Sequence, residues 1–310
     1  RHGGTCEFRY LRKLLIPTGS GLYVDPDLGK VLDVRDLELL TGSLSRDGEE
    51  IYWELVRDAE EGNTDQRPVV VLSHGAGGSH AVWYQQVPQI GENYRVVTWD
   101  SRGFGNSTNN TDQLAPENAA RDLAVVLDEL EIFDAHLVGQ SMGGWHVSAF
   151  LTLFSERVRS ITYADTVGGL WTDDLRRAYE EFRAEGGLQG ARELPLVGGH
   201  LALWTGAPDR DVAQAFLYQA LGSFHSPPLD RLSEVLEFTI HHSDFDDLNI
   251  PVLFISGEYD QIFPASMLHD SANRVRGAQF VQIPDAGHSP YFEQPAAWNL
   301  ALLEFLATIN

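Results

Sequence analysis

A serine placed for nucleophilic chemistry lies at the centre of a G-x-S-x-G motif. The motif spans residues 139–143, and Ser141 is its serine. An apolar, strand-like run at 136–138 precedes it, and a helix-compatible stretch begins at Trp145. A sharp turn from strand to helix would hold the hydroxyl above a sheet, at the positive end of the following helix. The motif alone is weak in a chain with 29 glycines, so its place after a strand is what makes Ser141 a candidate nucleophile.

A serine hydroxyl needs a base, and the base needs an orienting partner. Asp260 follows a strand-like run at 252–256, and His288 lies in the loop after a second run at 279–283. Loops that follow parallel strands meet at one edge of a sheet. We therefore predict a catalytic triad in which Ser141 attacks, His288 moves the proton and Asp260 holds the histidine.

A second acid could replace Asp260. Asp165 ends the strand-like run at 158–164, and an acid there can also reach the histidine. Asp165 and Thr166 are more typical of a structural pair, so Asp260 is preferred.

Backbone donors for an oxyanion are expected in the glycine-rich turn at 74–78, directly after the β-branched run at 69–73. We predict that the N–H groups of Ala76 and Met142 form the oxyanion hole. His74 is interpreted as a structural residue that fixes this turn.

Aromatic side chains flank these motifs and could line an apolar pocket. We predict Trp83, Phe263 and Trp171 as substrate-binding residues, although aromatic residues near such a turn often only pack. No metal site is predicted. The cluster of His241, His242, Asp244 and Asp246 is interpreted as a solvated helix end.

The elements that must position these residues alternate between strands and helices from residue 34 onward. Two strands are expected at 37–44 and 51–56, and further strands at 69–73, 95–99, 136–138, 158–164, 252–256 and 279–283. This alternation indicates a mostly parallel, wound sheet. Between 167 and 247 the pattern instead predicts consecutive amphipathic helices, at 172–185, 209–221 and 229–241, as in a cap over one end of the sheet.

These motifs together resemble those of lid-bearing serine hydrolases of the α/β-hydrolase fold. The matching residues are His74 and Gly75, residues 100–107, residues 139–144, residues 257–260, and Gly287 with His288. The resemblance implies a mostly parallel eight-stranded sheet flanked by helices, with a helical cap inserted after the sixth strand. The expected domains are a core at 34–167 and 248–310, a cap at 168–247, and an N-terminal extension of unknown role at 1–33.

Composition narrows the possible partners. The chain has 310 residues, with 45 acidic against 22 basic side chains and a net charge of −23. Such a surface repels nucleic acid and anionic membranes, so a small-molecule substrate is expected. The chain has one cysteine and no apolar run of about 18 residues that could span a membrane, so we expect a cytoplasmic protein. The acidity, with only two lysines, fits either salt adaptation or an ordinary acidic protein, and the oligomeric state stays open.

The expected reaction is cleavage of a small or medium carboxylic ester or lactone through an acyl-enzyme, without a cofactor. A serine at position 141 disfavours relatives with an aspartate nucleophile, such as epoxide hydrolases. The resemblance leaves open a carbon–carbon bond hydrolase or a cofactor-free perhydrolase with the same triad, although Ser289 and Pro290 after His288 favour an esterase. It also leaves open an aminopeptidase, which would use Glu180, Glu181 or Glu185, and a receptor of the same fold with little or no turnover.

Overall fold

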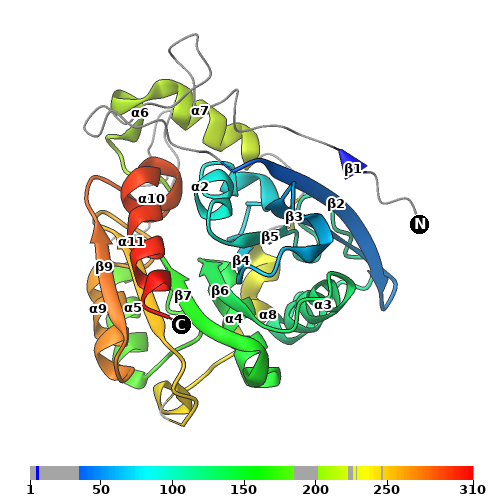
Figure 1. Ribbon diagram of the computed structural model, residues 1–310. Helices are drawn as coiled ribbons and strands as arrows, with labels where there is room; N and C mark the ends of the chain where they lie inside the picture. Colours follow the sequence, from blue (N-terminus) through cyan, green and yellow to red (C-terminus); the bar gives the residue numbers. More distant parts are fainter. Residues whose placement is uncertain are drawn as a thin grey trace.

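The computed structural model describes residues 5–6, 35–184, 202–222, 226–227, 229–245 and 247–309. These residues form one sheet flanked by helices (Figure 1). The strands are β1 (Thr5–Cys6), β2 (Leu37–Arg46), β3 (Glu49–Asp58), β4 (Val69–Ser73), β5 (Arg95–Trp99), β6 (Ala135–Gln140), β7 (Val158–Ala164), β8 (Val252–Gly257) and β9 (Gln279–Ile283). Their order in the sheet is β1-β2-β3-β5-β4-β6-β7-β8-β9.

The sheet is parallel from β5 through β9 and antiparallel at the other edge, where β1, β2 and β3 lie. The predicted α/β fold with a mostly parallel sheet is therefore confirmed. Strands β2–β9 are the eight that the sequence predicts, and β1 adds a two-residue strand within the N-terminal extension.

The strands β2 and β3 at the antiparallel edge form a hairpin, and its two turn residues determine the turn. Asp47 and Gly48 connect β2 to β3 with φ of 52° and 84°. Two consecutive positive φ angles match the right-handed twist of a two-residue hairpin, and Asp-Gly is a preferred pair for them. The strands extend further than predicted because the ladder runs from Leu37 opposite Asp58 to Arg46 opposite Glu49.

Helices cover both faces of the sheet. The α-helices are α2 (Val87–Gly91), α3 (Pro116–Glu129), α4 (Met142–Leu153), α5 (Asp173–Ala184), α6 (Ala207–Arg210), α7 (Val212–Leu221), α8 (Ser233–Glu237), α9 (Ala265–Arg274), α10 (Pro290–Glu293) and α11 (Pro295–Ala307). Short 3-10 helices include η2 (His80–Trp83) and η5 (Leu229–Leu232). Among the described residues, no helix is long and apolar enough to cross a membrane.

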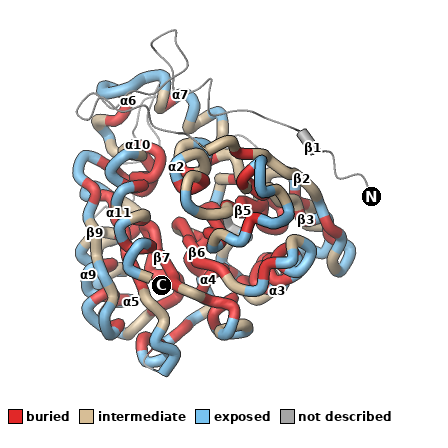
Figure 2. The backbone as a smooth tube through the Cα atoms, in the orientation of Figure 1, coloured by how far each residue is buried: buried red, intermediate tan, exposed pale blue. Residues whose placement is uncertain are grey.

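The central strands alternate between two apolar cores. Val69 and Val71 of β4 face the core that contains α3, α4 and α9, whereas Val70 and Leu72 face the core that contains α2 and α11. Every residue of β4, β6 and β8 is buried, and Figure 2 shows this buried interior along the middle of the sheet. Burial on both faces explains why these strands are continuous apolar runs in the sequence.

The helices between β7 and β8 differ in part from the predicted ones. Residues 209–221, predicted as one helix, form α6 and α7, which are separated at Asp211. Asp211 has extended backbone and its side chain accepts a hydrogen bond from Gln214 N, so it starts a new helix. The helix predicted at 229–241 ends at Glu237, because Phe238 is extended and Ile240 N bonds to Gly169 O. Residue 185, the predicted end of the first helix, lies outside the described residues.

Candidate active site

Ser141 lies on the turn between β6 and α4 with strained backbone. Its φ is 50° and its ψ is −119°, a conformation that costs a non-glycine residue free energy and that persists only where the surroundings enforce it. Ser141 N donates to Ala164 O over 2.9 Å. A Cβ at Gly139 would collide with the backbone of Gly143, and one at Gly143 would collide with the carbonyl of Ser73. The flanking glycines of the motif are therefore required by close backbone packing.

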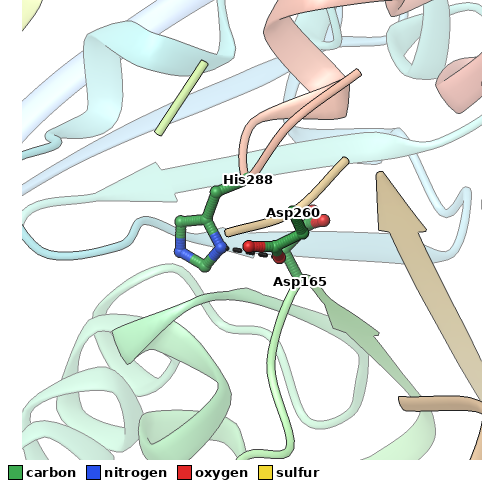
Figure 3. Close-up of side chains that lie close together, drawn as sticks. All are labelled: Asp165, Asp260 and His288. Carbon is green, nitrogen blue, oxygen red and sulfur yellow. Dashed lines mark hydrogen bonds and ion pairs between the residues drawn. The ribbon is translucent and has the colours of Figure 1, made fainter. Parts of the chain in front are cut away.

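His288 and Asp260 form the hydrogen bond that the sequence predicts. His288 Nδ1 lies 2.8 Å from Asp260 Oδ2, and both side chains are almost fully buried (Figure 3). Asp260 Oδ1 accepts from Ile262 N at 2.7 Å and from Phe263 N at 3.0 Å. The turn after β8 thus fixes the carboxylate, which then orients the imidazole.

Ser141 and His288 line the same cavity, with Gln140 between their loops. Gln140 Nε2 donates to His288 O over 2.9 Å, which ties the histidine loop to the serine turn. Within the described part of the chain, His288 Nε2 has no hydrogen-bond partner, so the bond to the Ser141 hydroxyl is not formed in this conformation. Such bonds often tighten only when substrate is bound.

Asp165, the second candidate acid, lies next to Asp260 but does not bond to the imidazole. Its Oδ1 accepts from Gly257 N at 2.8 Å. One carboxylate oxygen of Asp165, one carboxylate oxygen of Asp260 and one ring nitrogen of His288 lie within 4.8 Å of one another. Burial, reinforced by the neighbouring Asp260 carboxylate, raises the pKa of Asp165 well above its usual range.

The predicted oxyanion loop packs directly against the serine turn. A Cβ at Gly75 would collide with the Gln140 side chain, and Ala76 and Met142 both line the cavity. His74 is buried, with Nδ1 2.8 Å from Gly75 O and Nε2 accepting from Ser101 N at 3.1 Å. Because burial lowers the pKa of His74, the ring is neutral and can make both contacts.

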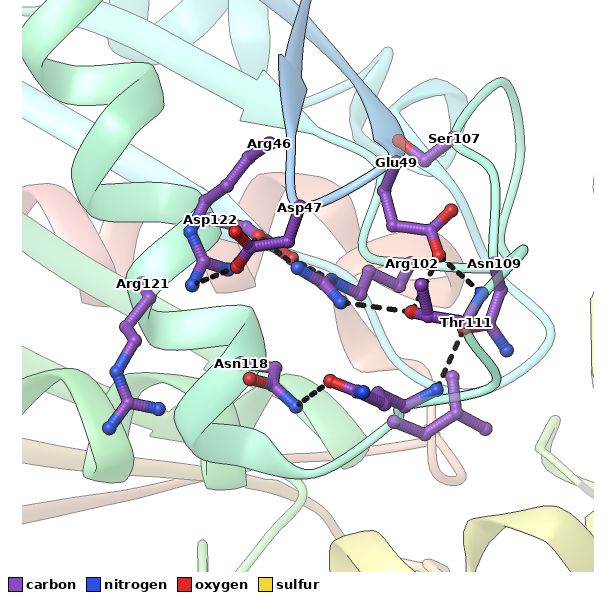
Figure 4. Close-up of polar contacts among 12 residues, drawn as sticks. Arg46, Asp47, Glu49, Arg102, Ser107, Asn109, Thr111, Asn118, Arg121 and Asp122 are labelled. Atoms are coloured by element: carbon purple, nitrogen blue, oxygen red, sulfur yellow. Dashed lines mark hydrogen bonds and ion pairs between the residues drawn. The ribbon is translucent and has the colours of Figure 1, made fainter.

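A network of charged and polar residues surrounds Arg102, which lies in the loop after β5 (Figure 4). Arg102 donates to both carboxylate oxygens of Asp122, at 2.6 and 2.9 Å, and Arg46 bonds to the same carboxylate. Burial alone would raise the pKa of Glu49, but hydrogen bonds from Thr108 and Thr111 lower it to about 2. The two hydrogen bonds to Asp122 hold the Arg102 side chain within the protein.

The cavity beside Ser141 has a volume of about 360 Å³. Phe263, one of the predicted substrate-binding residues, lines it together with Trp145. Trp83 and Trp171 are not among its described lining residues. Trp83 is fully buried against Tyr291 and Trp298, and Trp171 packs against Tyr179.

Several lining residues that the sequence pattern does not identify come from the helices between β7 and β8. These are Tyr179 of α5, Tyr218 of α7, Leu232 of η5, and Val235 and Leu236 of α8. Amphipathic periodicity can indicate their helices but not which side chains face Ser141.

The cluster of ligand-type residues at 241–246 forms a local turn in its described part. His241 N donates to Asp244 Oδ2 at 2.9 Å, which closes the turn through the backbone. Asp246 lies outside the described residues.

A second group without a sequence signal connects α6 and α7 to the histidine loop. Arg210 donates to Asp285 O and Glu293 O, Gln214 donates to Phe292 O, and the Tyr218 hydroxyl lies 2.7 Å from Ser289 Oγ. Gln214 and Tyr218 are four residues apart on α7, a spacing that places helical side chains on one face, and Arg210 is the last residue of α6.

Glu293 completes this connection from the other side. Its Oε1 accepts from Gly287 N at 2.7 Å and its Oε2 from Trp204 N at 2.8 Å. Burial raises the pKa of Glu293 to about 7 despite these two donors.

Comparisons with known proteins agree with this architecture. BpoC of Mycobacterium tuberculosis, provisionally named a non-heme bromoperoxidase, is 28% identical over 83% of this chain and 100% of its own length. The 3-oxoadipate enol-lactonase 1 of Acinetobacter baylyi is 28% identical over 79% of this chain and 91% of its own. A thermophilic esterase from Thermogutta terrifontis superposes with a TM-score of 0.69 at 23% identity, covering 87% of this chain and 98% of the esterase.

The family model described as alpha/beta hydrolase fold matches residues 68–295. This range includes the serine turn, the oxyanion loop and the loops that carry Asp260 and His288. The chain belongs to the alpha/beta hydrolase fold family.

Proposed function

We propose that the protein is a serine hydrolase that cleaves a small or medium carboxylic ester or lactone through an acyl-enzyme. The observation that carries the proposal is the 2.8 Å contact between His288 Nδ1 and Asp260 Oδ2, on an imidazole that lines the same cavity as Ser141. An imidazole held in this way keeps Nε2 free to accept the serine proton.

The proposed chemistry follows the protons. The Ser141 hydroxyl attacks the ester carbonyl while His288 Nε2 takes its proton, and the resulting imidazolium is stabilised by Asp260. The same proton then passes to the leaving alkoxide, which departs as an alcohol and leaves the acyl group on Ser141 Oγ. A water molecule that gives its proton to His288 attacks the acyl carbonyl, and His288 then returns that proton to Ser141 Oγ as the bond to the acyl group breaks and the acid departs.

The tetrahedral intermediates carry a negative charge on the former carbonyl oxygen. The N–H groups of Ala76 and Met142 are the proposed donors for this charge, since both residues line the cavity next to Ser141. Met142 is the first residue of α4, and a first-turn N–H has no acceptor within its own helix. Loss of one such donor typically lowers kcat by about 100- to 1,000-fold.

The cavity favours an uncharged, partly apolar acyl group. Its described lining has Trp145, Tyr179, Phe263 and several aliphatic side chains, and it has no lysine, arginine, aspartate or glutamate. A substrate with a free carboxylate would lose hydration there without gaining a cation. Its volume, about 360 Å³, lies at the small end of ligand-pocket sizes.

We also propose that residues 168–247 act as the cap. The described part of this region contributes Tyr179, Tyr218, Leu232, Val235 and Leu236 to the cavity wall. In Figure 1, α6 and α7 lie beyond one end of the sheet, near α10. A wall of this kind would exclude polymeric substrates.

The test is hydrolysis of p-nitrophenyl acetate, butyrate and octanoate, compared with the p-nitrophenyl monoester of glutaric acid, whose acyl chain ends in a carboxylate. We expect kcat/KM for butyrate to exceed that for the glutarate monoester by at least about tenfold. A preference for the anionic ester would refute the proposed substrate class. Hydrolysis by Ser141→Ala at the wild-type rate would refute the mechanism.

Assays with other substrates and with ligands distinguish an esterase from three alternatives of this fold. Turnover of ring-cleavage dienones without ester turnover would indicate a carbon–carbon bond hydrolase. Peroxyacid formation from acetate and hydrogen peroxide, again without ester turnover, would indicate a perhydrolase. Saturable ligand binding without any turnover would indicate a receptor.

A further inference from the structure

Asp165 is a buried carboxyl group that the proposed reaction does not use. It follows β7 directly, its φ is 52°, and its side chain is fully buried. Its backbone N–H donates to Ile255 O over 2.8 Å, and its Oδ1 accepts from Gly257 N. These two bonds fix the side chain between β7 and β8, so its position beside the triad is imposed by the sheet.

The second oxygen of Asp165 has no donor. Oδ2 is buried and has no hydrogen-bond partner among the described residues. One carboxylate oxygen of Asp165, one of Asp260 and one ring nitrogen of His288 all lie within 4.8 Å of one another (Figure 3). An ionised carboxylate with an unpaired buried oxygen next to a second carboxylate is strongly disfavoured.

Asp260 has one acceptor position left over. A carboxylate offers about four lone-pair positions. Three are filled, by Ile262 N and Phe263 N on Oδ1 and by His288 Nδ1 on Oδ2. A proton on Asp165 Oδ2 would supply the fourth donor and would satisfy both carboxyl groups at once.

We infer that Asp165 is a positioning residue that stays protonated at neutral pH and donates its proton to the Asp260 carboxylate. The acid of the triad is then a carboxyl pair that holds one proton and one negative charge. The inference rests on the proposed function for its catalytic consequence, but the protonation state can be measured without a substrate.

The groups that face Asp165 come from several elements. Asp260 and His288 lie in the loops after β8 and β9, Glu293 lies on α10, and Tyr218 of α7 and Tyr291 of α10 are close enough to interact electrostatically with Asp165. The two acidic neighbours, Asp260 and Glu293, offer no positive charge. This setting agrees with the raised pKa of Asp165.

The first test is infrared spectroscopy of protein whose aspartate side-chain carboxyls carry carbon-13. This label moves aspartate bands away from those of glutamate, so Glu293 does not interfere. At pH 7 we expect a band from a protonated aspartic acid in the wild type and its loss in Asp165→Asn. Absence of the band from the wild type, or its persistence in the variant, would overturn the inference.

The second test compares two substitutions at the same site. Asn and Gly both tolerate a φ near 52°, so neither strains the backbone. Asp165→Asn keeps an acceptor for Gly257 N and a donor for Asp260, whereas Asp165→Gly removes both. We expect Asp165→Gly to lower kcat about tenfold or more, and Asp165→Asn to restore most of that loss.

The comparison with Asp260→Asn decides between the two acids. If Asp165 were the ionised acid, Asp165→Asn would lower kcat by about 10⁴-fold, as expected when the orienting acid of a triad becomes an amide. We expect that loss for Asp260→Asn alone. If the wild type hydrolyses no ester while the infrared band is present, the proposed function fails and the carboxyl pair remains.

Discussion

Glu293 predicts a pH dependence of stability with a defined sign. The carboxyl group is 3% exposed, and burial raises its pKa from the ordinary 4.5 to about 7. The folded state therefore binds a proton more tightly than the unfolded state does. Its contribution to stability is fully present below pH 4.5 and is lost as the pH rises through 7.

The magnitude follows from the same pKa difference. One pKa unit corresponds to about 1.36 kcal/mol, so raising the pKa from 4.5 to about 7 gives a loss of about 3 kcal/mol between these limits. Glu293→Gln removes this titration. Glutamine keeps an acceptor for only one of the two N–H donors, Gly287 and Trp204, so the variant should be about 1–3 kcal/mol less stable at pH 5.

The assay is urea unfolding of the wild type and of Glu293→Gln at pH 5, 6, 7 and 8. We expect the difference in free energy of unfolding to move by about 2–3 kcal/mol in favour of the variant as the pH rises. Subtracting the two free energies of unfolding at each pH removes the contribution of the buried histidines, because it is the same in both proteins. Glu304→Gln, at an exposed position on α11, is the control and should follow the wild type. A deficit of Glu293→Gln that stays constant from pH 5 to 8 would refute the reasoning.

Four further substitutions, one of them a control, test the contacts around the site. Gly143→Ala should lower the free energy of unfolding by more than about 2 kcal/mol, because its Cβ would meet two carbonyl oxygens. Gly77 has open space around it, so Gly77→Ala should lower the free energy of unfolding by only about 1 kcal/mol, because of its positive φ. Equal losses in urea unfolding would contradict this packing. Tyr218→Phe removes the hydroxyl that lies 2.7 Å from Ser289 Oγ. It should lower the free energy of unfolding by about 1 kcal/mol and kcat by less than about tenfold. An unchanged unfolding curve would count against the contact. Arg102→Lys removes a bidentate bond to the buried carboxylate of Asp122, so the free energy of unfolding should fall. The KM for a neutral ester should stay within about twofold of the wild-type value. A large rise in KM would place Arg102 in the substrate site instead.

The sequence predicts the parts of the fold that depend on local pattern. Strands such as Val69–Ser73 are buried on both faces and therefore appear as uninterrupted β-branched runs. The serine turn is predictable because its glycines are required by close packing of backbone on backbone. The preference for Asp260 over Asp165 agrees with the observed bond to His288, although only the structure gives the reason, which is the pair of backbone donors on Asp260 Oδ1.

The cavity wall is less predictable because it depends on side-chain direction. Trp83 is close in sequence to the oxyanion loop, yet its 3-10 turn directs the ring into the core against Trp298. Phe263, predicted from a similar position, does line the cavity. Tyr218 and Glu293 give no sequence signal, since Tyr218 bonds to a residue 71 positions away and Glu293 joins Gly287 to Trp204, which is 89 positions away.

The most direct test of the proposed mechanism is mass spectrometry of the protein quenched during turnover of p-nitrophenyl butyrate. The proposal predicts a mass increase equal to one butyryl group, located on the peptide that contains Ser141, together with a burst of p-nitrophenol equal to the enzyme concentration. Ser141→Ala should show neither signal, and its kcat should be lower by at least about 10⁴-fold. An acyl group on another residue, or steady hydrolysis by Ser141→Ala at the wild-type rate, would contradict the proposal.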